Sequence, residues 1–206
     1  MGVYKLSSAG GLATPRTNYS SFLAGNAGYV PPSYESIATT TLSSSQSTIT
    51  FSSIPATFKH LQLRVMARTD RAGSAYDAFL IKANNDGTSG KYFYHNIYGD
   101  GATPGAGLET AYNGAVVYRI GGATAPGNTF GITITDILDY TSTSKYKTFR
   151  SLGGADYNGS SPLGEVYFGS NLWTDTTDIT SLVIVPRTGT NFVNYSQFAL
   201  YGIKGA

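Results

Sequence analysis

Cysteine is absent from the 206 residues, which excludes disulfide cross-links, iron–sulfur clusters and thiolate catalysis. Charge is scarce as well, because Asp, Glu, Lys and Arg make up 13% of the chain, against roughly 25% in ordinary soluble domains. The formal net charge is +2 and the basic residues are scattered along the chain. No basic stripe is available to neutralise phosphates, so the sequence predicts no nucleic-acid binding.

Long apolar runs are missing too. No window of 18 or more apolar residues occurs, so no segment is predicted to span a membrane. The first residues lack the basic region and the apolar run of a secretory signal. We therefore expect a protein that is made in a cytoplasm and has no membrane partner.

Histidine, the commonest catalytic base and metal ligand, occurs only twice, as His60 and His95. Neither has a second His or Cys at ligand spacing. We interpret both as strand residues that bond to a backbone group or a tyrosine, in preference to the alternative of a ligand or a base.

Two pairs of acids are spaced closely, Asp136 with Asp139 and Asp175 with Asp178. Each pair either binds calcium together with loop carbonyls or caps a turn. Because neither has the Asp-x-Asp-x-Asp-Gly pattern of a calcium loop, we favour caps. No nucleophile elbow, phosphate loop or dinucleotide motif occurs. The sequence thus predicts no enzyme, no metal and no cofactor.

Short alternating runs, bounded by turn residues, fill most of the chain beyond residue 34, as in all-β sandwiches. Two Gly-rich segments, 99–114 and 121–128, interrupt the rhythm and are predicted to be long contact loops. The predicted strands are Glu35–Thr41, Ser47–Ser52, His60–Arg68, Asp77–Ala83, Tyr92–Tyr98, Val116–Ile120, Thr129–Asp136, Lys147–Leu152, Glu165–Leu172, Ser181–Pro186 and Gln197–Ile203, of which we expect one or two to be spurious.

This number and spacing of strands favours an antiparallel, jelly-roll-like β-sandwich over residues 34–206. An immunoglobulin sandwich has fewer strands and a Cys…Trp…Cys core, which this chain cannot form. The preceding residues, 1–33, mix isolated apolar residues with Gly, Ser and Pro without any period, so they cannot build a core.

Residues 1–33 are either a disordered leader or an extended, non-regular arm that becomes ordered on a partner. We favour the arm, because disordered tails are poor in aromatic residues and this segment has an apolar or aromatic residue every few positions. The residues predicted to contact the partner are Tyr4, Leu6, Leu12, Tyr19, Phe22 and Leu23.

Tyrosine is abundant, with 16 residues. Tyr92, Tyr94 and Tyr98 share one face of a predicted strand, whereas Phe93 and Ile97 share the other. We consider the tyrosines a candidate surface row, which serves as a carbohydrate platform or a subunit interface. Ordinary cross-strand packing of the three rings is the alternative.

Several segments together resemble a group of virion structural proteins of tailed phages of aquatic bacteria, cyanophages especially. The similarity runs from about Tyr34 to the C-terminal residues and includes part of the arm. Its segments are Lys5–Leu12, Phe22–Asn26, Tyr34–Ala38, Ser47–Pro55, His60–Arg64, Asp136–Tyr140, Tyr146–Gly154 and Phe198–Gly205.

The resemblance implies a component of the virion that is made in the host cytoplasm and binds other virion proteins. One station is the head, where a homo-oligomeric decoration or cement protein, with a trimer favoured, would bind the capsid shell through its arm. The alternative is a tail-fibre or adhesin component that binds host surface glycans, and a free carbohydrate-binding module is a third hypothesis. We favour the head, because no heptad or β-helix repeat forms a shaft.

Overall fold

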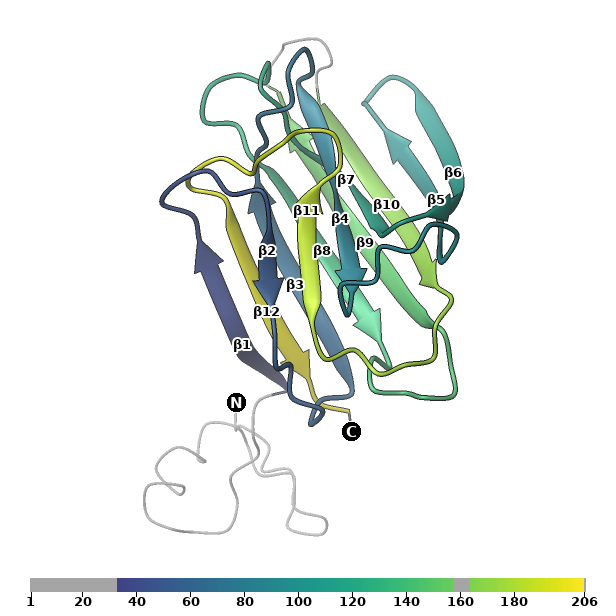
Figure 1. Cartoon of the computed structure of the whole chain (residues 1–206). Coiled ribbons are helices and arrows are strands. Elements are labelled where there is room, and N and C mark those ends of the chain that lie inside the picture. The colour runs from purple at the N-terminus through teal and green to yellow at the C-terminus, as the bar shows by residue number, and fades with distance from the viewer. Residues whose placement is uncertain (1–32, 158–163, 206) are drawn as a thin grey trace, which may run out of the picture. The chain divides into compact units, whose positions relative to one another are not determined.

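The computed structural model describes residues 33–157 and 164–205, so the predicted arm lies outside the described residues apart from Ser33. The described chain is all-β and folds into two antiparallel sheets that pack as a sandwich (Figure 1). In chain order its strands are β1 (Tyr34–Thr41), β2 (Ile49–Phe51), β3 (His60–Ala67), β4 (Tyr76–Ala83), β5 (Tyr92–Gly99), β6 (Pro104–Tyr112), β7 (Ala115–Gly121), β8 (Gly131–Leu138), β9 (Lys147–Asp156), β10 (Gly164–Trp173), β11 (Leu182–Pro186) and β12 (Gln197–Ile203).

The strand order identifies a jelly roll. The large sheet has the order β1-β12-β3-β8-β9-β10-β5-β6, and the small sheet has the order β2-β11-β4-β7. The strands β1-β12-β3-β8 of the large sheet and the four strands of the small sheet form the two four-stranded layers of a jelly roll. Along the chain these eight strands alternate between the layers except at β4 and β7, which pair within the small sheet. The predicted jelly-roll-like sandwich is therefore confirmed.

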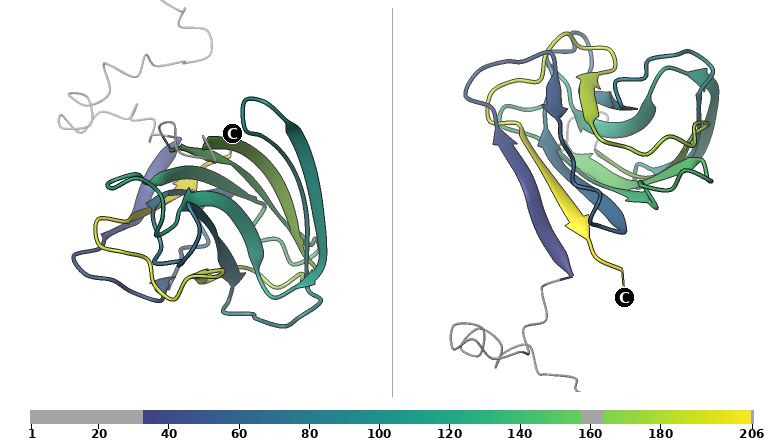
Figure 2. Two further views of the ribbon diagram at one scale, coloured as in Figure 1. Left: turned by 90° about the horizontal axis from the view of Figure 1, so that it is seen from above. Right: turned by 60° about the horizontal axis from the view of Figure 1, so that its bottom comes forward.

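Two hairpins are added to this jelly roll. The strands β5 and β6 lie in the chain between β4 and β7, and β9 and β10 lie between β8 and β11. The β9–β10 hairpin joins the large sheet beside β8, and the β5–β6 hairpin follows beside β10, so the large sheet has eight strands while the small sheet has four. Figure 2 shows the large sheet curving, with the β5–β6 hairpin at its far edge.

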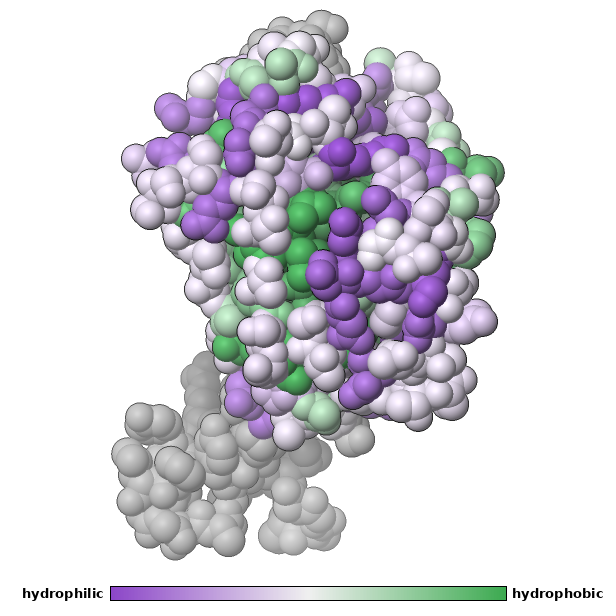
Figure 3. All heavy atoms as spheres, in the orientation of Figure 1, coloured by the Kyte–Doolittle hydropathy of each residue, from purple (hydrophilic) through white to green (hydrophobic). Residues whose placement is uncertain are grey.

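The core fills the space between the sheets, because alternate residues of each strand point inward. In β3, Leu61, Leu63 and Val65 are buried, as the sequence predicts. At the jelly-roll end, the rings of Phe79, Phe192 and Phe198 pack edge to face. Figure 3, which shows the molecule from the side of the small sheet, has apolar residues in a central hollow bordered by hydrophilic ones.

All eleven predicted strands are present, and the expectation that one or two are spurious is wrong. The segment predicted as a loop at 99–114 contains a further strand, β6. Its composition, rich in Gly and Ala, disfavours strands, but pairing with β5 along most of its length satisfies its backbone. No helix in the part of the chain that the structure describes is long and apolar enough to cross a membrane.

Candidate functional site

The outer face of the large sheet carries a contiguous apolar surface. Ile134, Leu152, Phe168 and Ile97 are paired directly across β8, β9, β10 and β5. Met66 on β3, Ile132 on β8 and Val166 on β10 form an adjacent row, two residues along from the first, with Gly154 of β9 between the last two. We call these seven side chains, which are 37–66% exposed, the apolar face.

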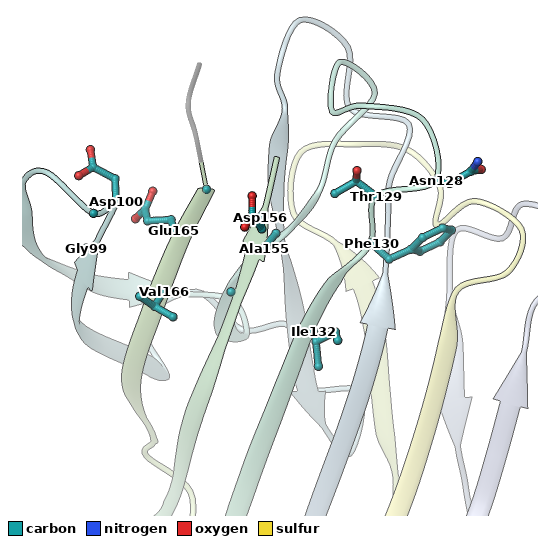
Figure 4. A pocket seen from close by; sticks show the side chains of 13 residues that line it. Gly99, Asp100, Asn128, Thr129, Phe130, Ile132, Ala155, Asp156, Glu165 and Val166 are labelled. Atoms are coloured by element: carbon teal, nitrogen blue, oxygen red, sulfur yellow. The ribbon is translucent and has the colours of Figure 1, made fainter. Parts of the chain in front are cut away.

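The apolar face is hollowed at one end. A cavity of about 420 Å³ is lined by Ile97, Leu152, Val166 and Phe168, together with Pro104 and four neighbouring residues. A wider depression of about 750 Å³ lies next to it at the strand ends, with Ile132 and Val166 in its lining (Figure 4). Monomers rarely expose so many adjacent large apolar side chains, so such a surface indicates a binding interface.

Three acids, Asp100, Asp156 and Glu165, line the wider depression (Figure 4). Asp100 accepts hydrogen bonds from the backbone N–H groups of Ala102 and Thr103, which lower the pKa of its carboxyl. Burial raises the pKa of Glu165, and its ion pair with Arg119 offsets this only in part. The residues that the structure describes contain no group of three or more His, Cys, Asp or Glu that could hold a metal ion.

The predicted tyrosine row points into the sandwich. Tyr92 and Tyr94 are buried, with 0% and 2% exposure, and Tyr98 is half-buried, whereas Ile97 on the opposite face is 61% exposed. The shared parity of the tyrosines is confirmed, but the interpretation as a surface row is wrong. Tyr92 stacks on Trp173 in the core, with the ring centroids 6.2 Å apart.

Tyr94 and Tyr98 instead border a groove where the large sheet overhangs the small one. The small sheet ends at β7, so no further strand of it covers the inner face of β6. A cavity of about 220 Å³ lies there between β5, β6 and β7. We call it the overhang groove; its lining comprises Tyr94, Asn96, Tyr98, Ala106, Gly107, Leu108, Glu109, Tyr118 and Arg119.

Two β-bulges aim side chains into the overhang groove. In β7, Arg119 has no partner on β4, because Asp77 pairs with Ile120 and Ala78 pairs with Tyr118. As the extra residue of the bulge, Arg119 has a φ of 72°, and the bulge lets the consecutive Tyr118 and Arg119 both line the cavity. Left-handed backbone at a non-glycine residue costs about 1–2 kcal/mol, and such strain gathers at functional sites.

The second bulge lies in β6, where Ala111 has a φ of 65°. It places Glu109 and Tyr112 on the same face, although three positions separate them. Both bond to Arg187, which follows β11: Arg187 Nε lies 2.7 Å from Tyr112 Oη, and Arg187 Nη2 lies 2.7 Å from Glu109 Oε1. Burial lowers the pKa of Arg187, but the hydrogen bonds to Tyr112 and Glu109 outweigh it and the net change is upward.

Arg119 forms the opposite wall of the groove. Its Nη2 lies 2.5 Å from Glu165 Oε1, and its guanidinium lies over the rings of Tyr76 and Tyr98, 4.2 and 5.4 Å from their centroids. The groove is therefore lined by one arginine, Arg119, and one glutamate, Glu109, and each pairs with a residue outside the lining, Glu165 and Arg187 respectively.

Four polar atoms of the groove are buried and have no hydrogen-bond partner among the described residues: Tyr94 Oη, Asn96 Oδ1, Glu109 Oε2 and Arg119 Nε. A buried polar group without a partner costs about 1–3 kcal/mol, and native proteins have few of them. Four such atoms around one cavity therefore indicate a site that accepts a polar ligand or ordered water.

The other predicted residues have structural roles. His60 Nδ1 accepts a hydrogen bond from the backbone N–H of Asp139, as expected of a strand histidine. Asp139 pairs with Lys59 and Lys145. Asp175 pairs with Lys91 and also caps its turn by accepting from the Thr177 N–H.

The six arm residues proposed to contact a partner, from Tyr4 to Leu23, lie outside the described residues. The chain matches no protein-family model and no curated protein. The similarity of its segments to virion proteins therefore remains a prediction, and the function must be argued from the surfaces.

Proposed function

We propose that this protein is a non-enzymatic structural component of a phage virion, and that the apolar face joins it to further copies of itself. The resemblance of the sequence to virion proteins supports the setting. The apolar face is the observation that carries the proposal, because it supports assembly through an extended surface.

A second copy of the chain suits the apolar face because the face brings almost no charge to it. Arg64 is the one charged residue in the row with Ile134, and it lies at the edge of the patch. Its Nε donates to Gln62 Oε1 and its guanidinium lies 4.9 Å from the Tyr201 ring centroid. The neighbouring row of the same face carries Asp136 and Arg150, which lie directly opposite each other on β8 and β9, so copies that meet through this face bury apolar area with little net charge beside it.

Closed symmetry is the common arrangement of proteins present in many copies. We favour a trimer in which each subunit turns the apolar face toward the three-fold axis. In the favoured setting the trimer decorates the head, and the arm, residues 1–33, binds the capsid shell. A tail-fibre or adhesin station is the alternative.

The oligomer is tested by light scattering after size-exclusion chromatography of the full chain. The wild-type protein should elute as an oligomer, and Leu152→Asp with Phe168→Asp should give a monomer with unchanged circular dichroism. Thr50→Asp is the matched control, because Thr50 is exposed on β2 of the small sheet. A monomeric wild-type protein, or a folded double variant with the wild-type mass, would overturn the proposed assembly.

The station and the arm are tested on purified particles. Mass spectrometry should find copies on the order of hundreds per particle for a head protein and far fewer for a tail protein. Phe22→Ala with Leu23→Ala should reduce incorporation more than Lys5→Ala with Arg16→Ala, because large apolar residues contribute most of the binding energy of such arms. Equal incorporation of the two variants would contradict a docking role for the arm.

A further inference from the structure

The overhang groove has the chemistry of a ligand site, and this chemistry is independent of the apolar face. Tyr94 is almost fully buried and Arg119 is nine-tenths buried. Both residues line one cavity, and each has a buried polar atom without a hydrogen bond among the described residues, Tyr94 Oη and Arg119 Nε. A cavity with several convergent polar groups and aromatic walls is the usual form of a small-molecule site.

Charge narrows the class of ligand. Arg187 is paired with Glu109 and Arg119 is paired with Glu165, so the two cations and two anions around the groove balance. A phosphate or carboxylate would meet the free Oε2 of Glu109, and an ammonium ion would meet the guanidinium of Arg119. The arrangement therefore favours a neutral ligand over either kind of ion.

The hydrogen-bonding groups of the groove limit the class of ligand further. Asn96 Oδ1 and Glu109 Oε2 are acceptors, Arg119 Nε–H is a donor, and the Tyr94 hydroxyl is both. A ligand that satisfies all four must present several groups that donate and accept at close spacing. Neighbouring hydroxyls do both, so a polyhydroxylated ligand matches the set.

The size of the groove agrees with a sugar ring. Tyr98 and Tyr118 belong to its lining, but the Arg119 guanidinium lies over both rings, so the groove would hold a sugar by polar groups and not by an open aromatic face. The volume of about 220 Å³ is below the roughly 300–1,000 Å³ of sites for drug-sized ligands. It fits one ring of a glycan.

Glycines on β6 make the space. A Cβ on Gly107 would lie 2.6 Å from Asn96 Oδ1, and a Cβ on Gly105 would overlap the Tyr98 ring. Both positions need glycine for Asn96 and Tyr98 to occupy their places beside the cavity.

We propose that the overhang groove binds a single neutral pyranose unit of a glycan, with Tyr94, Asn96, Glu109 and Arg119 bonding to its hydroxyls. This goes beyond the structural role proposed above and does not depend on the apolar face or on the station in the virion.

The test is titration of the full-length, isotope-labelled protein with four methyl glycosides, those of glucose, galactose, mannose and N-acetylglucosamine, followed by NMR. Inorganic phosphate and choline serve as charged probes. At least one glycoside should shift the resonances of Tyr94, Asn96 and Arg119 with a Kd of about 0.1–10 mM, as expected for a few hydrogen bonds to a small ligand. No shift with any of the four, or tighter binding of either charged probe, would overturn the proposal.

Variants separate a built site from a water-filled gap. Asn96→Leu keeps the side-chain shape but removes the acceptor, and it should weaken binding about tenfold or more. Its control is His95→Leu, because the neighbouring side chain points to the outer face of the sheet. Gly107→Ala should abolish binding by displacing Asn96 without removing a polar group. Equal binding by Asn96→Leu and His95→Leu, or unchanged binding by Gly107→Ala, would contradict the site.

Discussion

The two ends of the sandwich consist of the same kind of strand, but different side chains fill the space between the sheets at each end. At the jelly-roll end both layers are present, and the rings that meet between them, such as those of Phe79, Phe192 and Phe198, carry no polar atoms. At the overhang the small sheet stops at β7, and the rings that meet at this edge are those of Tyr118 on β7 and of Tyr94 and Tyr167 on the large sheet. Where no strand of the small sheet covers the large sheet, polar and aromatic side chains therefore take the place of a purely apolar core.

This contrast predicts the largest stability effect at the jelly-roll end. Phe198 is fully buried against Phe192, so Phe198→Ala should lower the free energy of unfolding by about 3–5 kcal/mol through lost burial and a cavity. Phe168→Ala on the apolar face, where the ring is 41% exposed, should cost less than about 1 kcal/mol in the monomer. Urea denaturation measures both, and similar losses would refute the difference between them.

Tyr92 and Tyr94, which lie on the same strand, allow a finer comparison between a bonded core hydroxyl and a hydroxyl at the overhang groove. The Tyr92 hydroxyl accepts from the Ala83 N–H at 3.0 Å and donates to the Asp86 carbonyl at 3.3 Å, so Tyr92→Phe should cost about 1 kcal/mol. Tyr94 Oη makes no hydrogen bond of normal geometry among the described residues, although the Tyr167 hydroxyl interacts with it, so Tyr94→Phe should change the free energy of unfolding by less than Tyr92→Phe does. Thermal melts of the ligand-free protein would decide, and an equal loss in both variants would show that Tyr94 is bonded.

The smallest expected effect concerns pH. Hydrogen bonds from Lys59 and Lys145 lower the pKa of Asp139 from 3.8 to about 2. Because the folded-state pKa is the lower one, the stability that Asp139 contributes is fully present above the unfolded pKa and is lost as the pH falls through about 2. Asp139→Asn should flatten the loss of stability over this window.

Lys145→Gln should reduce the same slope, because it removes one partner of Asp139. Glu165 at the overhang has the opposite sign, since burial raises the pKa of its carboxyl. Its contribution is present below the unfolded pKa and is lost as the pH rises through the folded pKa. Thermal melts recorded from pH 2 upward test the direction of both pH effects. If the melting temperature of Asp139→Asn changes with pH as that of the wild-type protein does, Asp139 makes no such contribution.

Strand positions could be predicted from the sequence because alternation and turn residues are local signals. The turn at Asn84 and Asn85 is an example, since both adopt the left-handed backbone that asparagine tolerates. Strand β6 was missed because its stability depends on its partner β5 and not on its own composition.

The candidate sites could be predicted only in part, because they depend on how far each sheet extends. The parity of Tyr92, Tyr94 and Tyr98 is local, but whether that face or the face of Ile97 is covered depends on which strands lie opposite. Sequence reasoning also missed Arg119, Glu109 and Arg187, since a bulge leaves no local signal that we could identify. The run of apolar residues at alternate positions of β8, β9 and β10 is the signal that could have revealed the apolar face.

The jelly-roll pairing also bears on when this protein can fold. Strand β12 lies between β1 and β3, and β11 lies between β2 and β4, so late-synthesised strands fill the centres of both layers. On the ribosome, β1 and β3 must wait without their shared neighbour until the last strand emerges. We therefore expect the sandwich to close only after β12 has emerged, and to do so slowly, in milliseconds to seconds as for other folds dominated by distant contacts. During that wait the unpaired edges of β1 and β3 are open to strands of other nascent copies.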